Sequence, residues 1–477
     1  MSAPSPTAHA RAAPGPSFST LDLPEAQRAN LAQLGYAQMT PVQAASLPLA
    51  LAGRDLVVQA ETGSGKTAAF ALTLLTRLQP PAAAGPVAVQ ALVVCPTREL
   101  AEQVTHEIRR LARSEDNVRA LTLCGGMPLR RQQESLAHGA HVVVGTPGRL
   151  LDHLERGTLD LGALRTLVLD EADRMLDMGF FDDVAKIVRQ CPKERQTLMF
   201  SATYPDAITE LSKPFLRSPQ WLRVAAQRDA PLIEQRFYEV RDDQRLHAVD
   251  ALLQHFRPDS TIAFCNTKQQ CRDLTDVLLA QGHSVLALHG ELEQRERDQV
   301  LVQFANRSCS VLVATDVAAR GLDIAQLGAV INVDITPDPQ QHIHRIGRTG
   351  RAQASGLALS LASLDEMGSV GKIEQALGVE MAWYPLSELT PRPGGPVRPA
   401  MVTLQLVAGR KDKIRAGDVL GALTGEAGLR AEQVGKIHLN DHSTYVAVDR
   451  QVADAALARL NTGTIKGKRV KVRRVAP

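Results

Sequence analysis

A glycine-rich segment at residues 60–67, AETGSGKT, has the residue types that phosphate binding needs. It follows the apolar run 56–58 and precedes a helical pattern. Its glycines let backbone N–H groups turn toward phosphate oxygens, Lys66 can reach the outer phosphates of a nucleotide, and the Thr67 hydroxyl can ligate Mg²⁺. A flexible turn before an ordinary helix is the alternative for this motif alone. The predicted phosphate-binding residues are Thr62, Gly63, Ser64, Gly65, Lys66 and Thr67.

An acidic pair, Asp170 and Glu171, directly follows the apolar run 167–169. A carboxylate at a strand end can hold Mg²⁺ opposite Lys66, and its neighbour can orient or deprotonate an attacking water. We therefore assign Asp170, with Thr67, to the metal and Glu171 to the water. The alternative is an acidic helix start, which the helix dipole favours.

These residues depend on a series of buried strands for their positions. Short apolar runs alternate with helical patterns such as 97–112 and 180–190, as expected of parallel strands in a doubly wound sheet. The runs are 56–58, 91–94, 120–123, 141–144, 166–169 and 197–200, then 261–264, 285–288, 310–314, 329–333 and 356–361. The sequence thus predicts an α/β protein with two tandem doubly wound parallel-sheet domains.

A third, small α+β domain is predicted after a proline-rich stretch. Its order, strand, helix, two strands, helix and strand, is typical of RNA recognition modules. The third strand has one aromatic residue, Tyr445, so base stacking is not expected to be its main mode. The expected divisions are a disordered leader 1–17, domains 18–222 and 232–389 with a linker 223–231, a proline-rich linker 390–400 and the small domain 401–477.

Composition and charge agree with a multidomain nucleic-acid-binding protein. A length of 477 residues suggests about three domains. The stretch 410–474 has fourteen Lys or Arg against seven Asp or Glu, a balance of +7, whereas the other residues have 40 against 44, a balance of −4. A basic end on a faintly acidic body indicates a tethered polyanion-binding module, the alternative being a solvated lysine-rich tail.

Membrane and secretory classes are excluded by the same inspection. The sequence has no run of 18 apolar residues and no apolar signal segment near its start. The six cysteines form no CxxC pair, which argues against a disulfide framework or a structural zinc site. We expect a cytoplasmic protein with no membrane partner.

An ordered set of motifs resembles the DEAD-box RNA helicases over residues 18 to 365. It comprises Gln43 in TPVQ, AETGSGKT, PTREL at 96–100, Gly125-Gly126, TPGR at 146–149, DEAD at 170–173, SAT at 201–203, ATDVAARGLD at 314–323 and HRIGRTGR at 344–351. The resemblance implies two RecA-like domains that close around ATP and RNA, with ATP and Mg²⁺ as cofactors.

The resemblance also implies roles at the nucleotide. Gln43 would read the adenine edge, for which an amide is suited as both donor and acceptor, and Phe18 would stack on the base. Arg348 and Arg351 would stabilise charge on the γ-phosphate. Asp323 would face the ribose. Ser201 and Thr203 would couple hydrolysis to domain closure; by themselves these hydroxyls could equally cap a helix.

RNA contacts are expected at the carboxyl ends of successive strands, where ligands of open α/β sheets collect. Glycine and threonine there expose backbone N–H and hydroxyl donors to phosphates, and arginine supplies charge. Such contacts read the RNA backbone and not its sequence. The candidates are Pro96, Thr97, Arg98, Gly125, Gly126, Thr146, Pro147, Gly148 and Arg149 in the first domain and Gln294, Arg297 and Thr315 in the second.

The C-terminal stretch resembles the RNA-binding domain of the DbpA subfamily in GDVLGALTG at 417–425, GKI at 435–437 and YVAV at 445–448. This implies recognition of a hairpin in 23S-type large-subunit ribosomal RNA and a role in ribosome assembly on the pre-ribosomal large subunit. Generic surface charge is the alternative for each basic candidate. The candidates are Lys411, Lys413, Arg415, Lys466, Lys468 and Arg469.

The resulting hypothesis is a monomeric ATP-dependent RNA helicase that separates short duplexes locally. An ATP-switched RNA clamp is the rival, and the complete set of Glu171, Arg348 and Arg351 favours turnover over clamping. A DNA translocase is disfavoured by the RNA-type C-terminal module.

Overall fold

The computed structural model describes residues 15–60, 63–79, 87–115, 117–203, 213–224, 233–319, 327–350, 356–426 and 428–475. The chain divides into two compact units, Met1–Arg228 and Asp229–Pro477. The predicted residues Thr62, Asp323 and Arg351 lie outside the described residues, as does most of the predicted leader.

The first unit is built on a seven-stranded parallel sheet with the order β3-β4-β2-β5-β6-β1-β7. The strands are β1 (Leu56–Gln59), β2 (Ala91–Val94), β3 (Ala120–Leu123), β4 (Val142–Gly145), β5 (Thr166–Asp170), β6 (Gln196–Ser201) and β7 (Gln220–Arg223). Gln59 of β1 is level with Ser201 of β6, and Asp170 of β5 with Phe200. The ends of β1, β5 and β6 therefore lie together at one edge of the sheet.

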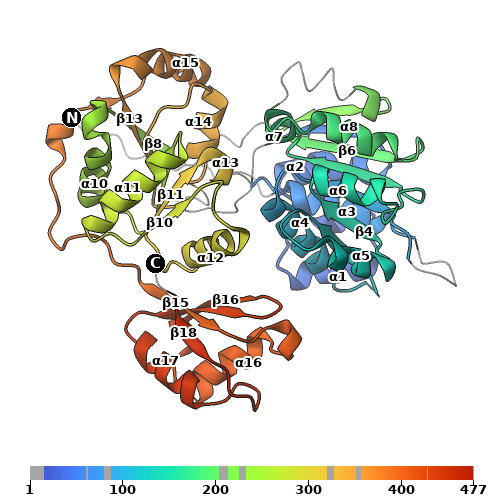
Figure 1. The fold of residues 1–477 in the computed structure, drawn as a ribbon. Helices are drawn as coiled ribbons and strands as arrows, with labels where there is room; N and C mark the ends of the chain where they lie inside the picture. Colours follow the sequence, from blue (N-terminus) through green and yellow to red (C-terminus); the bar gives the residue numbers. More distant parts are fainter. Residues whose placement is uncertain are drawn as a thin grey trace, which may run out of the picture. The chain divides into compact units, whose positions relative to one another are not determined.

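Helices pack on both faces of this sheet (Figure 1), as the apolar strands require. Consecutive residues of β2 show the alternation: Val93 faces one core with α3 and α4, and Leu92 faces the other with α6 and α8. The helices are α1 (Glu25–Gln33), α2 (Pro41–Leu51), α3 (Lys66–Thr76), α4 (Arg98–Leu111), α5 (Leu129–Ala137), α6 (Pro147–Glu155), α7 (Ala172–Asp177) and α8 (Phe181–Arg189).

The second unit repeats this architecture in a sheet with the order β10-β11-β9-β12-β13-β8-β14, also parallel. Its strands are β8 (Ile233–Glu239), β9 (Thr261–Cys265), β10 (Val285–Leu288), β11 (Val311–Thr315), β12 (Ala329–Asn332), β13 (Gly356–Ala362) and β14 (Trp383–Tyr384). Its helices are α10 (Arg245–Phe256), α11 (Lys268–Ala280), α12 (Gln294–Ala305), α13 (Asp316–Ala319), α14 (Pro339–Ile346) and α15 (Met367–Leu377). Separate apolar cores lie on the two faces.

A four-stranded antiparallel sheet, in the order β16-β17-β15-β18, forms the C-terminal part of the second unit. Its elements are β15 (Met401–Leu406), α16 (Ala416–Gly421), β16 (Val434–Leu439), β17 (Thr444–Asp449), α17 (Ala453–Thr462) and β18 (Val472–Arg474). The two helices share one apolar core with one face of the sheet. The α+β order and the two parallel sheets confirm the predicted fold class.

The proline-rich segment 390–400 contains no helix or strand, yet it is bonded to α10. The N–H of Thr390 donates to Nδ1 of His255 (3.1 Å), and that of Arg392 donates to the carbonyl of Gln254 (3.2 Å). The Arg257 side chain donates to the carbonyl of Gly395. The segment therefore lies along the second parallel-sheet domain.

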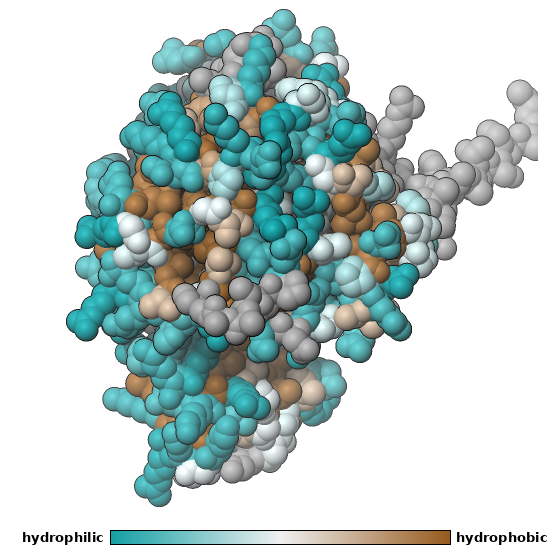
Figure 2. Space-filling model, turned by 90° about the vertical axis from the view of Figure 1, so that its right-hand side faces the viewer, coloured by the Kyte–Doolittle hydropathy of each residue, from teal (hydrophilic) through white to brown (hydrophobic). Residues whose placement is uncertain are grey.

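All six cysteines are buried free thiols. Within the described residues, no helix is both long and apolar enough to cross a membrane. Figure 2 shows hydrophilic residues over most of one face of the molecule, with hydrophobic residues in separate patches.

Candidate functional site

Among the described residues of the loop after β1, namely 60 and 63–65, Ala60 is bonded to Lys66 and Gly65 is bonded to Gln43 of α2. Gly65 has φ 97°, a left-handed conformation that glycine adopts without strain, and it leads directly into α3. Lys66 is 6% exposed, and its Nζ donates to the carbonyl of Ala60 at 2.8 Å. The ammonium group thus lies back over the loop whose N–H groups could receive phosphate.

Gln43 connects this loop to the start of α2. Its side-chain Oε1 accepts from the N–H of Thr40 at 2.9 Å, as part of a capping box, and its Nε2 donates to the carbonyl of Gly65 at 3.2 Å. A Cβ on Gly65 would come within 2.6 Å of Gln43 Nε2 and would strain the left-handed backbone, so a larger residue there would displace the Gln43 amide. The predicted adenine-reading amide therefore lies against the phosphate loop.

Phe18, the predicted base-stacking residue, is 4% exposed. Its ring packs edge-on against Tyr36 with centroids 6.0 Å apart. Its stacking role stays a prediction.

Asp170 ends β5 as a buried carboxylate, and its Oδ1 accepts the N–H of Glu171 at 3.1 Å. Burial raises the pKa of Asp170 to about 7, although nearby Lys66 opposes the rise. A buried carboxylate so poorly compensated suits a cation. Among the described residues, no three His, Cys, Asp or Glu side chains gather as a metal cluster. A single buried carboxylate of this kind is a ligand that Mg²⁺ can take, since that ion keeps several waters and binds one or two protein carboxylates plus phosphates.

Glu171 has a left-handed backbone, φ 53° and ψ 53°, which is uncommon for a residue with a side chain. Its carboxylate pairs with the Arg174 guanidinium at 2.8 Å, and both side chains are less than 10% exposed, at 8% and 6%. Strained backbone of this kind concentrates at functional sites. The DEAD motif at 170–173 did not predict that Arg174 is the ion-pair partner of Glu171.

Asp173 joins the acidic segment to the end of β6. Its Oδ2 accepts the N–H groups of Ala202 (3.1 Å) and Thr203 (2.9 Å) and the Thr203 hydroxyl (3.1 Å). Ser201 Oγ accepts the N–H of Asp173 at 3.1 Å and donates to the carbonyl of Thr203 at 2.7 Å. The structure thus brings Ser201 and Thr203 to the acidic segment.

The predicted RNA-binding residues of the first unit occupy the other half of the same sheet edge. They follow β3, β4 and β2, which are neighbours in the sheet, whereas the nucleotide candidates follow β5, β6 and β1. Thr97 caps α4 by accepting the N–H of Leu100 at 3.3 Å. Arg149 donates to the carbonyl of Met127 at 2.9 Å, so the loops after β3 and β4 are joined.

The remaining first-unit RNA candidates lie close to these loops. Gly126 has φ 75°, and a Cβ on Gly125 or Gly148 would meet no atom within 4 Å. Arg98 pairs with Glu102 at 2.8 Å. Pro96 directly precedes Thr97 in the chain, and Thr146 and Pro147 begin α6.

In the second unit, Gln294 begins α12 and Thr315 ends β11. The Arg297 guanidinium donates to the carbonyl of Ala318 at 2.6 Å, which joins α12 to α13. Arg348 is 7% exposed and follows α14.

Arg345 is a buried residue that the sequence reasoning did not single out. It is 2% exposed and donates to both oxygens of Asp316 (2.7 and 2.6 Å), to Asn266 Oδ1 (2.9 Å) and to the carbonyl of Asp334 (2.8 Å). It therefore ties together the segments that follow β9, β11 and β12. The signal for Arg345 in the sequence is its position in the HRIGRTGR motif.

The C-terminal basic candidates gather although they are far apart in sequence. Lys466 Nζ donates to the carbonyl of Lys413 (2.9 Å), and Lys468 Nζ donates to that of Asp412 (3.0 Å). Lys411, Lys413, Arg415, Lys466, Lys468 and Arg469 lie in the loops around these bonds. By contrast, Tyr445 is 6% exposed, and its hydroxyl accepts from Gln405 at 2.9 Å, so its ring is not an open stacking platform.

A phosphate loop and a strand-end acidic pair on the first of two parallel-sheet domains define the class of two-domain P-loop nucleoside triphosphatases. Family models match in order: DEAD/DEAH box helicase at residues 40–211, helicase conserved C-terminal domain at 244–353 and DbpA RNA binding domain at 403–474. The chain belongs to the DEAD-box ATP-dependent RNA helicases of the DbpA type.

Individual relatives support the same family assignment. The ATP-dependent RNA helicase DbpA of Escherichia coli is 51% identical over 96% of this chain and 99% of its own length. The ATP-dependent RNA helicase CshA of Listeria monocytogenes is 44% identical over 75% of this chain and 68% of its own. A solved structure of S. cerevisiae Dbp5 bound to RNA and ADP BeF3 superposes with a TM-score of 0.71 at 31% identity, covering 78% of this chain and 96% of that one.

The family assignment confirms the predicted activity: the chain is an ATP-dependent RNA helicase that binds RNA through its helicase core and its C-terminal domain.

Proposed function

We propose that this helicase remodels large-subunit ribosomal RNA during ribosome assembly in the cytoplasm, with the C-terminal domain selecting a hairpin. The observation that carries the proposal is the convergence of Lys411, Lys413, Lys466 and Lys468 on two bonded loops, within a domain of the DbpA type. Cations on adjacent loops can follow a phosphate backbone, and a folded hairpin offers such a backbone in a fixed shape.

The nucleotide chemistry rests on the edge formed by β1, β5 and β6. Lys66 and the N–H groups of residues 63–67 bind the phosphates, while Asp170 and Thr67 hold Mg²⁺. When bound, the metal neutralises charge on the phosphate oxygens. Glu171 orients the attacking water and takes its proton, for which it must turn from Arg174 (2.8 Å) toward the nucleotide.

The second unit contributes positive charge to hydrolysis. Arg348 and Arg351 stabilise the transferring phosphoryl group, and Asp323 contacts the ribose. Ser201 and Thr203 relay the state of the acidic segment to domain closure, which is supported by the hydrogen bonds of Thr203 to Asp173. Gln43 and Phe18 bind the adenine.

Selectivity belongs to the C-terminal domain in this proposal, because the core candidates contact backbone. Thr97, Gly126 and Arg149 present hydroxyl, N–H and guanidinium groups at strand ends, and such groups carry no sequence information.

The test compares ATP hydrolysis stimulated by a large-subunit ribosomal RNA fragment containing the hairpin and by an unrelated hairpin of equal length, at stated salt. The full-length variant carrying Lys411→Gln, Lys413→Gln and Arg415→Gln should lose the preference and keep the unrelated-RNA stimulation. Lys372→Gln, an exposed site on α15, serves as the control. A triple variant that still prefers the ribosomal fragment would place selectivity elsewhere and overturn the proposal.

A further inference from the structure

The C-terminal sheet is joined to the second parallel-sheet domain by buried polar contacts. Val402 and Leu404 face the core of their own small domain, so Thr403 between them faces the opposite way. Thr403 is fully buried, at 0% exposure; its Oγ1 accepts from Asn306 Nδ2 at 3.1 Å and shares a hydrogen bond with Ser308 Oγ at 2.6 Å. We call Thr403, Asn306, Ser308 and the hydrogen bonds between them the seam.

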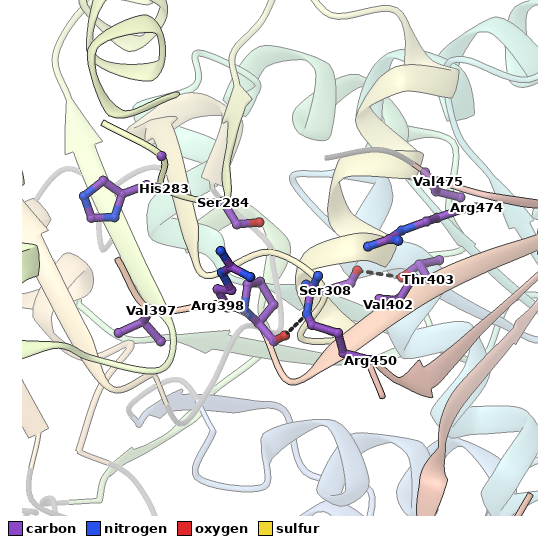
Figure 3. A pocket seen from close by; sticks show the side chains of 12 residues that line it. His283, Ser284, Ser308, Val397, Arg398, Val402, Thr403, Arg450, Arg474 and Val475 are labelled. Atoms are coloured by element: carbon purple, nitrogen blue, oxygen red, sulfur yellow. Dashed lines mark hydrogen bonds between the residues drawn. The ribbon is translucent and has the colours of Figure 1, made fainter. Parts of the chain in front are cut away.

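A cavity of about 260 Å³ lies beside the seam. Both sides contribute to it: His283, Ser284 and Ser308 from one domain, Arg450 and Arg474 from the other, and Arg398 from the segment between them. Figure 3 shows Arg474 next to the hydrogen bond between Ser308 and Thr403, with Arg450 between this bond and Arg398. The cavity has room for a phosphate group with ordered waters, since one water occupies about 30 Å³.

The lining is positive, with no Asp or Glu among the lining residues. Burial lowers the pKa of Arg450, and the charges of Arg474 and Arg398 lower it further, so both of these guanidinium groups repel that of Arg450. Two acids contact lining residues from outside the cavity: Asp250 is bonded to His283 Nε2 at 2.7 Å, and Asp454, 90% exposed, is 3.9 Å from Arg474. An anion between the arginines would relieve the repulsion.

The donors are also available. Arg450 uses its Nε for the carbonyl of Pro399 at 2.6 Å, which fixes the guanidinium and leaves its terminal N–H groups for a ligand. With the described residues, the Arg398 side chain forms no hydrogen bond or ion pair, and the buried Ser284 Oγ forms no hydrogen bond. An oxygen-rich ligand would supply such partners.

The basic loops of the proposed hairpin site lie at the other end of the same sheet. Met401 pairs with Asp449 at the cavity end of β15, whereas Leu406 pairs with Thr444 near the loops that contain Lys411 and Lys413. Six residues of strand separate the two ends by on the order of 20 Å. An RNA held at the loops therefore has a second positive site within reach.

We propose that the cavity formed by Arg398, Arg450 and Arg474 binds a phosphodiester group of RNA that extends from the C-terminal domain toward the second parallel-sheet domain. The contact is to the backbone and therefore independent of sequence. This proposed contact requires only that the chain binds RNA, and it does not depend on the ribosomal target proposed above.

The test uses the full-length protein without nucleotide and two labelled RNA hairpins, one ribosomal and one unrelated, each with the same single-stranded extension. The double variant Arg398→Gln/Arg474→Gln keeps Arg450 and its bond to Pro399. The matched control, Arg430→Gln/Lys372→Gln, removes the same charge at exposed sites outside the cavity. Dissociation constants are measured over a series of KCl concentrations, and circular dichroism and basal ATP hydrolysis check the fold.

The cavity variant should flatten the slope of log K against log salt by about 0.7 to 0.9 for each phosphate that it no longer binds, and it should weaken binding about 10-fold at low salt. The control should change affinity less than about 2-fold. An equal change in the control, or an unchanged slope in the cavity variant, would overturn the proposal. An equal effect on both hairpins with no ribosomal preference would refute the target proposed above and leave this one standing.

Two additional measurements distinguish RNA binding in the cavity from a purely structural role of the arginines and from a site for small anions. Thr403→Val breaks the seam bonds without changing charge and should leave the slope unchanged; a slope flattened as much as in the arginine variant would show that the arginines only hold the domains together. Inorganic phosphate, tested against chloride at equal ionic strength, should compete with RNA. If phosphate stabilises the parent but not the cavity variant while RNA binding is unaffected, the cavity is a small-anion site and the RNA proposal is wrong.

Discussion

Thr203 donates both its backbone N–H (2.9 Å) and its hydroxyl (3.1 Å) to the same carboxylate oxygen of Asp173. We predict that Thr203→Val, which loses only the hydroxyl bond, keeps RNA-stimulated ATP hydrolysis within about 2-fold and slows strand separation about 5-fold or more, since one bond contributes about 1 kcal/mol. Both rates are measured on one short duplex. Thr203→Ser should behave like the parent, and equal losses of both rates in the valine variant would contradict a coupling role.

Lys66→Ala should reduce ATP hydrolysis at least about 100-fold, because the ammonium group that reaches the phosphates is lost. The Nζ bonds only to the carbonyl of Ala60 among the described residues, so the far-ultraviolet circular dichroism should remain that of the parent. Steady-state hydrolysis with saturating RNA provides the measurement. Parental hydrolysis in this variant would remove the phosphate-loop assignment.

Glu171→Gln should retain ATP binding and lower hydrolysis on the order of 100-fold, as the water loses its base. It should also destabilise the first unit, because Arg174 is left as an unpaired buried charge, a change that typically costs about 3–5 kcal/mol. The double variant Glu171→Gln/Arg174→Met separates the two effects: thermal unfolding should recover toward the parent, whereas hydrolysis should not. Recovery of hydrolysis would mean that the carboxylate served only the ion pair.

Arg348→Ala should suppress RNA-stimulated hydrolysis and leave nucleotide affinity within about 2-fold, since the lost charge acts in the transition state. Fluorescent-nucleotide binding and stimulated turnover are compared in the same preparation. Arg348→Lys, which keeps the charge but loses the planar fork, should recover only part of the rate. Because Arg348 is 7% exposed, proportionate loss of basal and stimulated rates would indicate misfolding instead.

His342 should remain neutral well below the pH at which free histidine titrates. Burial, aided by the Arg345 charge, lowers its pKa to about 4, while its ring bonds to Gln235 at 3.1 Å. The unfolded histidine takes up a proton near pH 6.5, whereas the folded one does not. The free energy of unfolding therefore falls by about 3 kcal/mol in total as the pH falls from about 6.5 to about 4. Histidine NMR titration, with the resonance identified by its absence in His342→Gln, should give a midpoint near 4; a midpoint near 6.5 would refute this.

Most of the central strands and the nucleotide motifs could be predicted because each leaves a local signal. Apolar runs such as 91–94 mark strands buried on both faces, and a glycine-rich turn before a helix marks the phosphate loop. The edge strands β7 and β14 were not predicted, because one face or both remain exposed and their sequences, QWLR and WY, have no apolar run. The interior strand β8 was not predicted either, because its sequence, IEQRFYE, is largely polar.

Partners that are distant in the chain could not be predicted from either signal. Arg345 contacts Asn266 across 79 residues, and Thr403 contacts Ser308 across 95. Nothing near either residue in the sequence specifies that partner, because the pairing depends on how whole strands and helices pack.

The bonds of Lys66 to Ala60 and of Gln43 to Gly65 make nucleotide binding an exchange reaction. Both donors already have an acceptor. A phosphate or base that binds there must therefore replace a carbonyl oxygen. The number of hydrogen bonds changes little, and at Lys66 the gain comes from exchanging a neutral carbonyl acceptor for a charged phosphate oxygen. The protein should therefore distinguish triphosphate from diphosphate mainly by charge, and because Lys66 is buried, added salt should weaken this distinction little.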